Sequence, residues 1–389
     1  MKENKVLKIL FISILLFSMF GVPPSIFRIE RSSLLDLVSV NNLIFKSISI
    51  FLVFLHAILF SNFKKNILKL NKISILYPLI FFKLYVLLKY LFQIQIVFGL
   101  LEFGLFLAFL YSYLQISDKL SRREIYYAIH MTSWIFIVLN LVQYFNNPKA
   151  LFISDRFISI TGNSNHAAVI LALLILLNST SLSLGYFKRL NTLLLVFLTP
   201  MLIFTGSKTG FIILIPFIIW NFYSSQNKIK YLFLFLFLII ISTYFENNYL
   251  FLKSDNIFER SLNFEDTRTV KWKESLLSFS ENPFFGVYNL NQRPSYVENS
   301  YLACLQNYGL IGLIFFSIFI KRIYDYFVFR KNLHSSLMYL SIIGILIGAF
   351  FEAFLMSSTN FTLHVLLILI ILKTKENENN TGYFFNRQI

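Results

Sequence analysis

The chain has 389 residues, of which 57% are hydrophobic and 14% are charged, and its mean hydropathy is +0.67. A soluble domain of this length could not bury so much apolar side chain, so the composition excludes a water-soluble globular protein and indicates that lipid surrounds most of the chain. The formal net charge of +16 does not indicate nucleic-acid binding, because the basic residues are not gathered on a face interleaved with aromatic side chains.

Apolar runs of roughly 20 residues recur along the chain, and this is the length at which an α-helix crosses about 30 Å of hydrocarbon. They predict about twelve transmembrane helices, at residues 6–22, 43–61, 73–92, 94–116, 124–146, 165–185, 190–206, 209–224, 230–246, 300–320, 336–356 and 360–373. The expected fold is an all-α polytopic membrane protein with one large periplasmic loop. Helices 1–9 fall in residues 1–245, the loop in 246–299, and helices 10–12 with a cytoplasmic tail in 300–389.

The distribution of charge predicts the orientation of these helices. With the N-terminus in the cytoplasm, 21 lysines and arginines lie in inside segments or at inside helix ends, and five lie in the short outside loops. Counting the three lysines within spans as outside still leaves 21 against eight, which agrees with the positive-inside rule. We therefore expect a multi-pass protein of the bacterial inner membrane with both termini in the cytoplasm.

The first outside segment with candidate site residues is SDRFISITGNSNHAA, which places Arg156 in a short polar loop before a predicted span. Asn163, Ser164 or Asn165 can cap that helix. The second is TGSKTG, which places Lys208 in a tight turn between two spans. Helix N-termini and a nearby guanidinium together favour phosphate oxygens. A single basic residue at a membrane boundary is usually a snorkelling anchor, but several on one side favour a binding site.

The segment 246–299 is the one stretch long and polar enough to form structure outside the bilayer, so we expect it to carry the function. Within it, NFEDTRTVKWKESLLSFSENP predicts a short amphipathic helix at the membrane surface, ended by Pro283. The charges of the loop are mixed in sign. Binding of an anionic ligand is therefore expected to depend on one or two placed arginines.

These segments, in this order, resemble the O-antigen ligase and O-antigen polymerase superfamily, whose members assemble surface polysaccharide on the outer face of the inner membrane. The resemblance covers roughly 150–320 and four motifs. The first three are the Arg, Gly and Asn-rich loop, the Ser-Arg-small turn with Lys in place of Arg, and the Arg, Trp, Asn-Pro and Gly run. They are carried by Arg156, Gly162 and Asn165, by Ser207, Lys208 and Thr209, and by Arg268, Trp272, Asn282, Pro283 and Gly286.

The fourth motif, ENSYLACLQNYGLIGL, resembles the segment in which the long loop of that family returns to the membrane. The position of the usual family His is Glu298 here, whereas Asn299 and Gly309 keep the pattern. In ligases that His is assigned a role in activating the acceptor, so its replacement favours a polymerase. Glu298 can still accept a proton. A structural alternative is that Glu298 only stabilises the start of the helix that begins near Asn299.

The resemblance implies a glycosyltransferase that joins undecaprenyl-diphosphate-linked oligosaccharide repeat units into O-antigen or capsule-type polysaccharide on the periplasmic face. A departing pyrophosphate needs positive charge, for which Arg268 and Arg156 are the best candidates and Lys208 the third, because arginine binds phosphate in two places. Glu298 is the expected base for the acceptor hydroxyl, and Glu298 and Arg268 are the predicted catalytic residues. Membrane lipid and a chain-length regulator protein are the further expected partners.

No Gly-rich phosphate loop and no histidine pair with metal-ligand spacing is present in the sequence, so we expect no cofactor and no metal. Three alternatives remain at this stage. The first is an O-antigen ligase that transfers polysaccharide to lipid A-core. The second is a polysaccharide flippase that uses intramembrane acids such as Glu102 and Glu352. The third is an assembly partner without chemistry. His166 borders the Arg156 loop, but a polar residue near a helix start explains it more simply.

Overall fold

The computed structural model describes residues 2–19, 74–92, 96–153, 156–224, 267–287, 297–327, 333–355 and 360–385, and the structural statements below refer to them. Nearly all of these residues are helical. The helices are α1 (Lys2–Met19), α5 (Tyr77–Phe92), α6 (Ile96–Lys119), α7 (Arg122–Asn146), α8 (Ser164–Ser183), α9 (Lys188–Phe204), α10 (Lys208–Ser224), α13 (Thr267–Glu281), α14 (Ser300–Tyr326), α15 (Leu333–Gly348) and α16 (Phe361–Phe385). Two short 3₁₀ helices, η2 (Pro148–Leu151) and η3 (Ser159–Thr161), lie between α7 and α8.

Five described helical segments are long and apolar enough to cross a membrane: Ser74–Phe92, Gly99–Lys119, Arg122–Asn146, Ser164–Ser183 and Ser300–Tyr326. Large apolar side chains project outward from these helices, and Phe92, Val97 and Phe145 are 74%, 68% and 80% exposed. Water would penalise exposure of this kind, whereas lipid tails would not. The chain is therefore a membrane-embedded helical protein.

Each predicted span within the described residues overlaps one helix, whereas the predictions at 43–61 and 230–246 lie outside these residues, as do 246–266 and 288–296 of the predicted loop. Three details differ from expectation. The predicted span 336–356 ends as a helix at Gly348, and residues 349–355 are irregular. The predicted span 360–373 is part of a longer helix, α16. The fold is also not purely helical, because β1 (Phe152–Ile153) and β2 (Arg156–Phe157) form a small antiparallel hairpin.

Nearly all of the apolar window of helix α8 is buried inside the protein. This helix contacts α7, α9, α10 and α15. Small residues line one of these contacts: a Cβ atom on Gly210 of α10 would lie 2.9 Å from the Cβ of Ala168 in α8. Without a hydrophobic force between helices in lipid, such close backbone contact is a main source of helix association.

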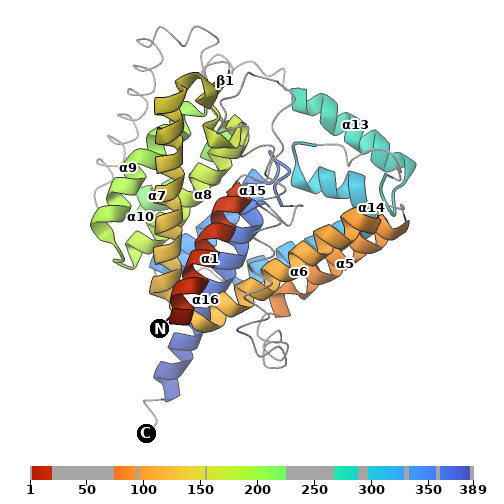
Figure 1. Cartoon of the computed structure of the whole chain (residues 1–389). Coiled ribbons are helices and arrows are strands. Elements are labelled where there is room, and N and C mark those ends of the chain that lie inside the picture. The colour runs from red at the N-terminus through yellow and green to blue at the C-terminus, as the bar shows by residue number, and fades with distance from the viewer. Residues whose placement is uncertain are drawn as a thin grey trace.

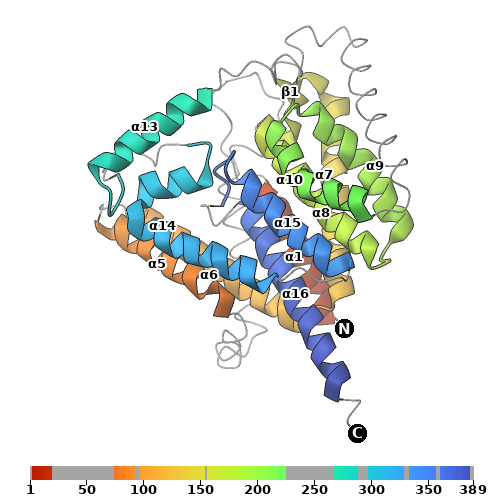
Figure 2. The same ribbon diagram turned by 180° about the vertical axis from the view of Figure 1, so that it is seen from behind.

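The two views in Figures 1 and 2 agree on the arrangement of the helices. Helices α5, α6 and α14 lie side by side, and α7, α8, α9 and α10 form a separate group. Both chain termini lie at one end of the molecule. The opposite end carries β1, β2 and α13, and we call it the distal end (Figure 1).

Candidate functional site

Arg156 lies in β2 at the distal end, where its guanidinium joins three chain segments. Its Nε donates a hydrogen bond to the backbone oxygen of Thr205 at 2.9 Å, and its Nη2 donates to Oδ1 of Asn165 at 3.0 Å. Thr205 ends α9, and Asn165 lies in the first turn of α8. The half-buried guanidinium is therefore held in one orientation, beside the starts of α8 and α10.

The loop that carries Arg156 into α8 is fixed by side chains. Oδ1 of Asn140 accepts hydrogen bonds from Oγ of Ser159 at 2.8 Å and from the backbone N–H of Ile160 at 3.0 Å. Ser159 has a φ of 58°, a conformation that costs about 1–3 kcal/mol outside glycine and persists only where the surroundings enforce it. Asn163 then caps α8, as the sequence predicts, by accepting hydrogen bonds from two backbone N–H groups of the first turn.

The turn TGSKTG places two buried hydroxyl groups at the start of α10. Gly206 has a φ of 57°, which reverses the chain after α9, and α10 begins at Lys208. Among the described residues, neither Oγ of Ser207 nor Oγ1 of Thr209 has a hydrogen-bond partner, although Ser207 is 2% exposed and Thr209 is 0% exposed. A helix N-terminus offers unpaired N–H groups and a partial positive charge. The guanidinium of Arg156 binds the backbone oxygen of Thr205, two residues before Ser207. This turn is therefore suited to bind the oxygens of an anion.

Lys208 is exposed at the first position of α10. The sequence names it as the third phosphate ligand, and the structure brings it into the same turn as the hydroxyl groups. Arg156 and Lys208, which are far apart in sequence, are therefore near neighbours through the Arg156–Thr205 hydrogen bond.

Glu298 belongs to a second group at the distal end, where α13 lies against α14. Its Oε1 is 3.3 Å from Nζ of Lys271 in α13. Oγ of Ser275, one turn further along α13, donates a hydrogen bond to Oε1 of Gln306 at 3.1 Å. The cap of α14 is Asn299, whose side chain accepts hydrogen bonds from two backbone N–H groups. Asn299 rather than Glu298 therefore makes the capping hydrogen bonds of α14, and Glu298 lies one residue before the cap.

Arg268 occupies the first turn of α13, and its side chain lies outside the described part of the structure. The sequence did not identify Lys271 as a site residue. The signal was present, because Lys271 and Ser275 are four residues apart and so lie on one face of a helix. That face is the one turned toward α14.

Glu352 lies beside the start of α14 rather than inside a transmembrane helix. It belongs to the irregular residues after α15 and is 5% exposed. Its backbone oxygen accepts a hydrogen bond from Oγ of Ser300 at 2.7 Å, and the N–H of Ser300 donates to the oxygen of Ala349 at 2.8 Å. Through Ser300, buried Glu352 thus contacts the start of α14, two residues along the chain from Glu298. The positions of the two residues in the sequence did not reveal this proximity.

Two of the described histidines, His166 and His364, have structural partners. Nε2 of His166 donates a hydrogen bond to the backbone oxygen of Met19 at 3.0 Å and so joins α8 to the end of α1. Nδ1 of His364 lies 2.8 Å from the hydroxyl oxygen of Tyr113 in the buried core. The structural interpretation of His166 therefore agrees with its contact.

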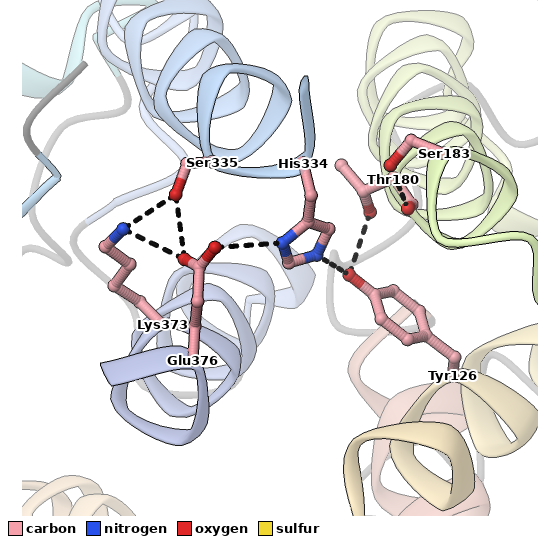
Figure 3. Close-up of polar contacts among 7 residues, drawn as sticks. All are labelled: Tyr126, Thr180, Ser183, His334, Ser335, Lys373 and Glu376. Atoms are coloured by element: carbon pink, nitrogen blue, oxygen red, sulfur yellow. Dashed lines mark hydrogen bonds and ion pairs between the residues drawn. The ribbon is translucent and has the colours of Figure 1, made fainter. Parts of the chain in front are cut away.

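A buried polar cluster lies at the opposite end, near both termini, and joins α7, α8, α15 and α16 (Figure 3). Nε2 of His334 is 2.9 Å from the hydroxyl oxygen of Tyr126, and Nδ1 is 3.7 Å from Oε1 of Glu376. Lys373 and Ser335 donate hydrogen bonds to Oε2 of Glu376 at 2.9 and 2.8 Å.

Glu376 lies beyond the apolar run of α16, and its carboxylate is the centre of this cluster. Burial raises its pKa, but the nearby imidazole of His334 and the hydrogen bonds from Lys373 and Ser335 outweigh burial and lower the pKa to about 2. A carboxylate, a histidine and a hydroxyl group that contact one another in this order are typical of sites that activate a nucleophile. Here the residues of the cluster come from different helices, and the contacts of His334 join α7, α15 and α16.

The distal end therefore carries two groups of different chemistry. One is the basic and hydroxyl group of Arg156, Ser207, Lys208 and Thr209, which suits anion binding. The other is Glu298 with Lys271, which offers a half-buried carboxylate for proton transfer. No protein-family model matches the chain, and no curated protein matches it.

Proposed function

We propose that this protein is a glycosyltransferase that joins undecaprenyl-diphosphate-linked oligosaccharide repeat units into O-antigen or capsule-type polysaccharide. The observation that carries the proposal is the fixed guanidinium of Arg156 beside the start of α10, with two buried hydroxyl groups that lack partners among the described residues. A diphosphate has the oxygens and the charge for this turn, and a lipid-linked substrate requires an enzyme embedded in lipid.

In the proposed reaction, the oxygen of an acceptor sugar hydroxyl attacks the anomeric carbon of the donor glycan. The bond from that carbon to the diphosphate oxygen breaks, and the lipid diphosphate departs with the electron pair. Arg156, Lys208 and Arg268 stabilise the negative charge that grows on the leaving group. Glu298 accepts the hydroxyl proton. The ammonium of Lys271, 3.3 Å away, favours the carboxylate form that can accept it.

We place the distal end on the periplasmic face of the bacterial inner membrane, with both termini in the cytoplasm. The excess of basic residues in the inside segments supports this orientation. A tag at position 270, in α13, is expected to be accessible from the periplasm, and a tag at position 327, after α14, is expected to be cytoplasmic. Labelling of both tags from the same side would contradict the orientation.

A ligase would use the same donor, and Glu298 in the place of the usual histidine favours the polymerase. A flippase would need intramembrane acids whose protonation changes. Glu102 instead forms a 2.9 Å ion pair with Lys83, whose side chain is 2% exposed, which supports a structural role for this acid.

The test is to supply lipid-linked repeat units to the purified protein in liposomes. Chain elongation supports the proposal; transfer to lipid A-core, movement of lipid-linked units across the bilayer without elongation, or neither would overturn it. Arg156→Ala is expected to reduce elongation by about 10²–10³-fold, as for loss of a placed donor. Arg189→Ala is the matched control, because Arg189 is exposed at the other end of α9.

A further inference from the structure

Helix α14 is broken about a third of the way along its length, at Gly309. Gly309 has a φ of 65° and a ψ of −164°, which are not helical values, so the helix consists of two parts. A break frees backbone N–H and C=O groups, and in a membrane each group left without a partner costs several kcal/mol. The partners of the freed groups therefore indicate what the break is for.

The segment 283–287, which follows α13, fills the break from one side. The N–H groups of Leu310 and Ile311 donate hydrogen bonds to the oxygens of Pro283 and Phe284 at 2.9 and 3.3 Å. The N–H of Val287 donates to the oxygen of Gln306 at 2.8 Å. We call residues 283–287 the docking segment.

Two glycines make this backbone contact possible. A Cβ atom on Gly286 would lie 2.6 Å from the backbone oxygen of Gln306. A Cβ atom on Gly309 would collide with the backbone oxygen of Phe284. The third and fourth sequence motifs each contain one of these glycines, so the two motifs meet at the break.

Helix α5 fills the break from the other side. Nζ of Lys89 donates hydrogen bonds to the backbone oxygens of Phe285, in the docking segment, and Asn307, in α14. The hydroxyl of Tyr85 donates to the oxygen of Tyr308 at 2.9 Å. Lys89 is thus a tethered cation that binds oxygens from both parts at once. A lysine that served only as a snorkelling anchor would direct its ammonium to headgroups and water instead.

The docking segment connects this break to the candidate site. Helix α13 ends at Glu281, directly before the docking segment, and contacts the first part of α14 through the Ser275–Gln306 hydrogen bond. At its other end the Lys271–Glu298 ion pair forms. Anything that loosens the docking segment therefore also loosens the contact of α13 with Glu298.

We infer that Lys89 is a positioning residue: its ammonium holds the docking segment in the break of α14 and thereby sets α13 and Lys271 against Glu298. The inference rests on the proposed function for its effect on catalysis, but not for its effect on the backbone. It assigns a role to an intramembrane lysine that touches no substrate.

The experiment compares Lys89→Met and Lys89→Arg with wild-type protein in two measurements. The first is hydrogen exchange in peptides that cover 283–287 and 306–311. Lys89→Met is expected to speed exchange there by about tenfold or more, because a charge-assisted contact is lost, without changing exchange in α8. Lys89→Arg is expected to restore protection, since its N–H groups can reach both oxygens.

The second measurement is chain elongation. Lys89→Met is expected to lower kcat by about 10²-fold, more than loss of the Lys271–Glu298 pair alone, because α13 also carries the proposed catalytic residue Arg268 and its displacement misplaces that group. The KM for the lipid-linked donor should stay within about threefold, because the Arg156 turn is untouched. The matched control is the double variant Lys83→Met with Glu102→Gln, which removes the ion pair between α5 and α6 and keeps the side chains of Lys89 and Tyr85 that bind the break.

Unchanged exchange at the docking segment in Lys89→Met would overturn the inference, as would faster exchange with normal kcat. An equal loss of kcat in the double control variant would also overturn it. If the wild-type protein does not elongate chains, the proposed function fails, and the exchange measurement still decides whether Lys89 holds the docking segment.

Discussion

Glu298→Gln tests the proposed proton acceptor with little change in shape. The carboxylate pairs with Lys271 at 3.3 Å, and the side chains of Glu298 and Lys271 are 21% and 43% exposed. Ion pairs with this degree of exposure contribute about 0–1 kcal/mol, so the free energy of unfolding should fall by no more than about 1 kcal/mol. Loss of a general base lowers the rate by about 10²–10⁴-fold, or about 3–5 kcal/mol at 1.36 kcal/mol per tenfold. The expected loss of activity thus exceeds any effect of the ion pair itself.

The assay measures the elongation rate in liposomes at matched protein abundance. Lys271→Gln is the control, because it breaks the same ion pair but keeps the carboxylate, and it should lower the rate by less than about tenfold. Near-normal elongation by Glu298→Gln would remove the catalytic assignment. Equal losses in the two variants would show that the ion pair matters and the proton acceptor does not.

Three further predictions concern the donor site, the break in α14 and the terminal cluster. Arg268→Ala should cost about 2–4 kcal/mol of transition-state stabilisation, and Arg268→Lys should recover only part of it, as measured by kcat/KM; full activity in the alanine variant would remove Arg268 from the mechanism. Gly309→Ala should destabilise the protein by about 1–3 kcal/mol or more because of its positive φ and the collision at Cβ, whereas Gly104→Ala, with open space at Cβ, should be neutral or slightly stabilising in thermal unfolding. The lowered pKa of Glu376 predicts stability that is present above pH 4.5 and is lost as the pH falls toward 2, so the Tm of Glu376→Gln should depend less on pH in that window than the Tm of wild-type protein.

Helix positions were predictable because the membrane imposes a length and an apolar composition on each span. The end of α15 was not. Ala349, Phe350 and Phe351 continue the apolar run, but the chain leaves the helix at Gly348 so that the oxygen of Ala349 can accept a hydrogen bond from Ser300. The hydropathy of these residues does not predict a hydrogen bond to a residue so far away in the sequence.

In the candidate site, too, local features could be predicted from the sequence and long-range contacts could not. Arg156, Lys208 and the cap at Asn163 were recognisable from local residue types and from a family resemblance. The contact of Arg156 with Thr205 joins residues 49 apart, and no local pattern encodes it. Lys89 reads in the sequence only as a charge within a span, because the oxygens that it binds are 196 and 218 residues away.

The buried cluster near the termini shows that the apolar run of α16 ends before the buried part of this helix does. The apolar run of α16 ends at Leu372, which suggests a safe position for a truncation or a fusion partner. Lys373 and Glu376 lie just beyond this point and are buried against Ser335 and His334 (Figure 3). A chain cut at this boundary would keep the apolar run of α16 but remove the contacts of Lys373 and Glu376 with Ser335 and His334 of α15. A C-terminal reporter is therefore better fused after residue 385, where the helix ends.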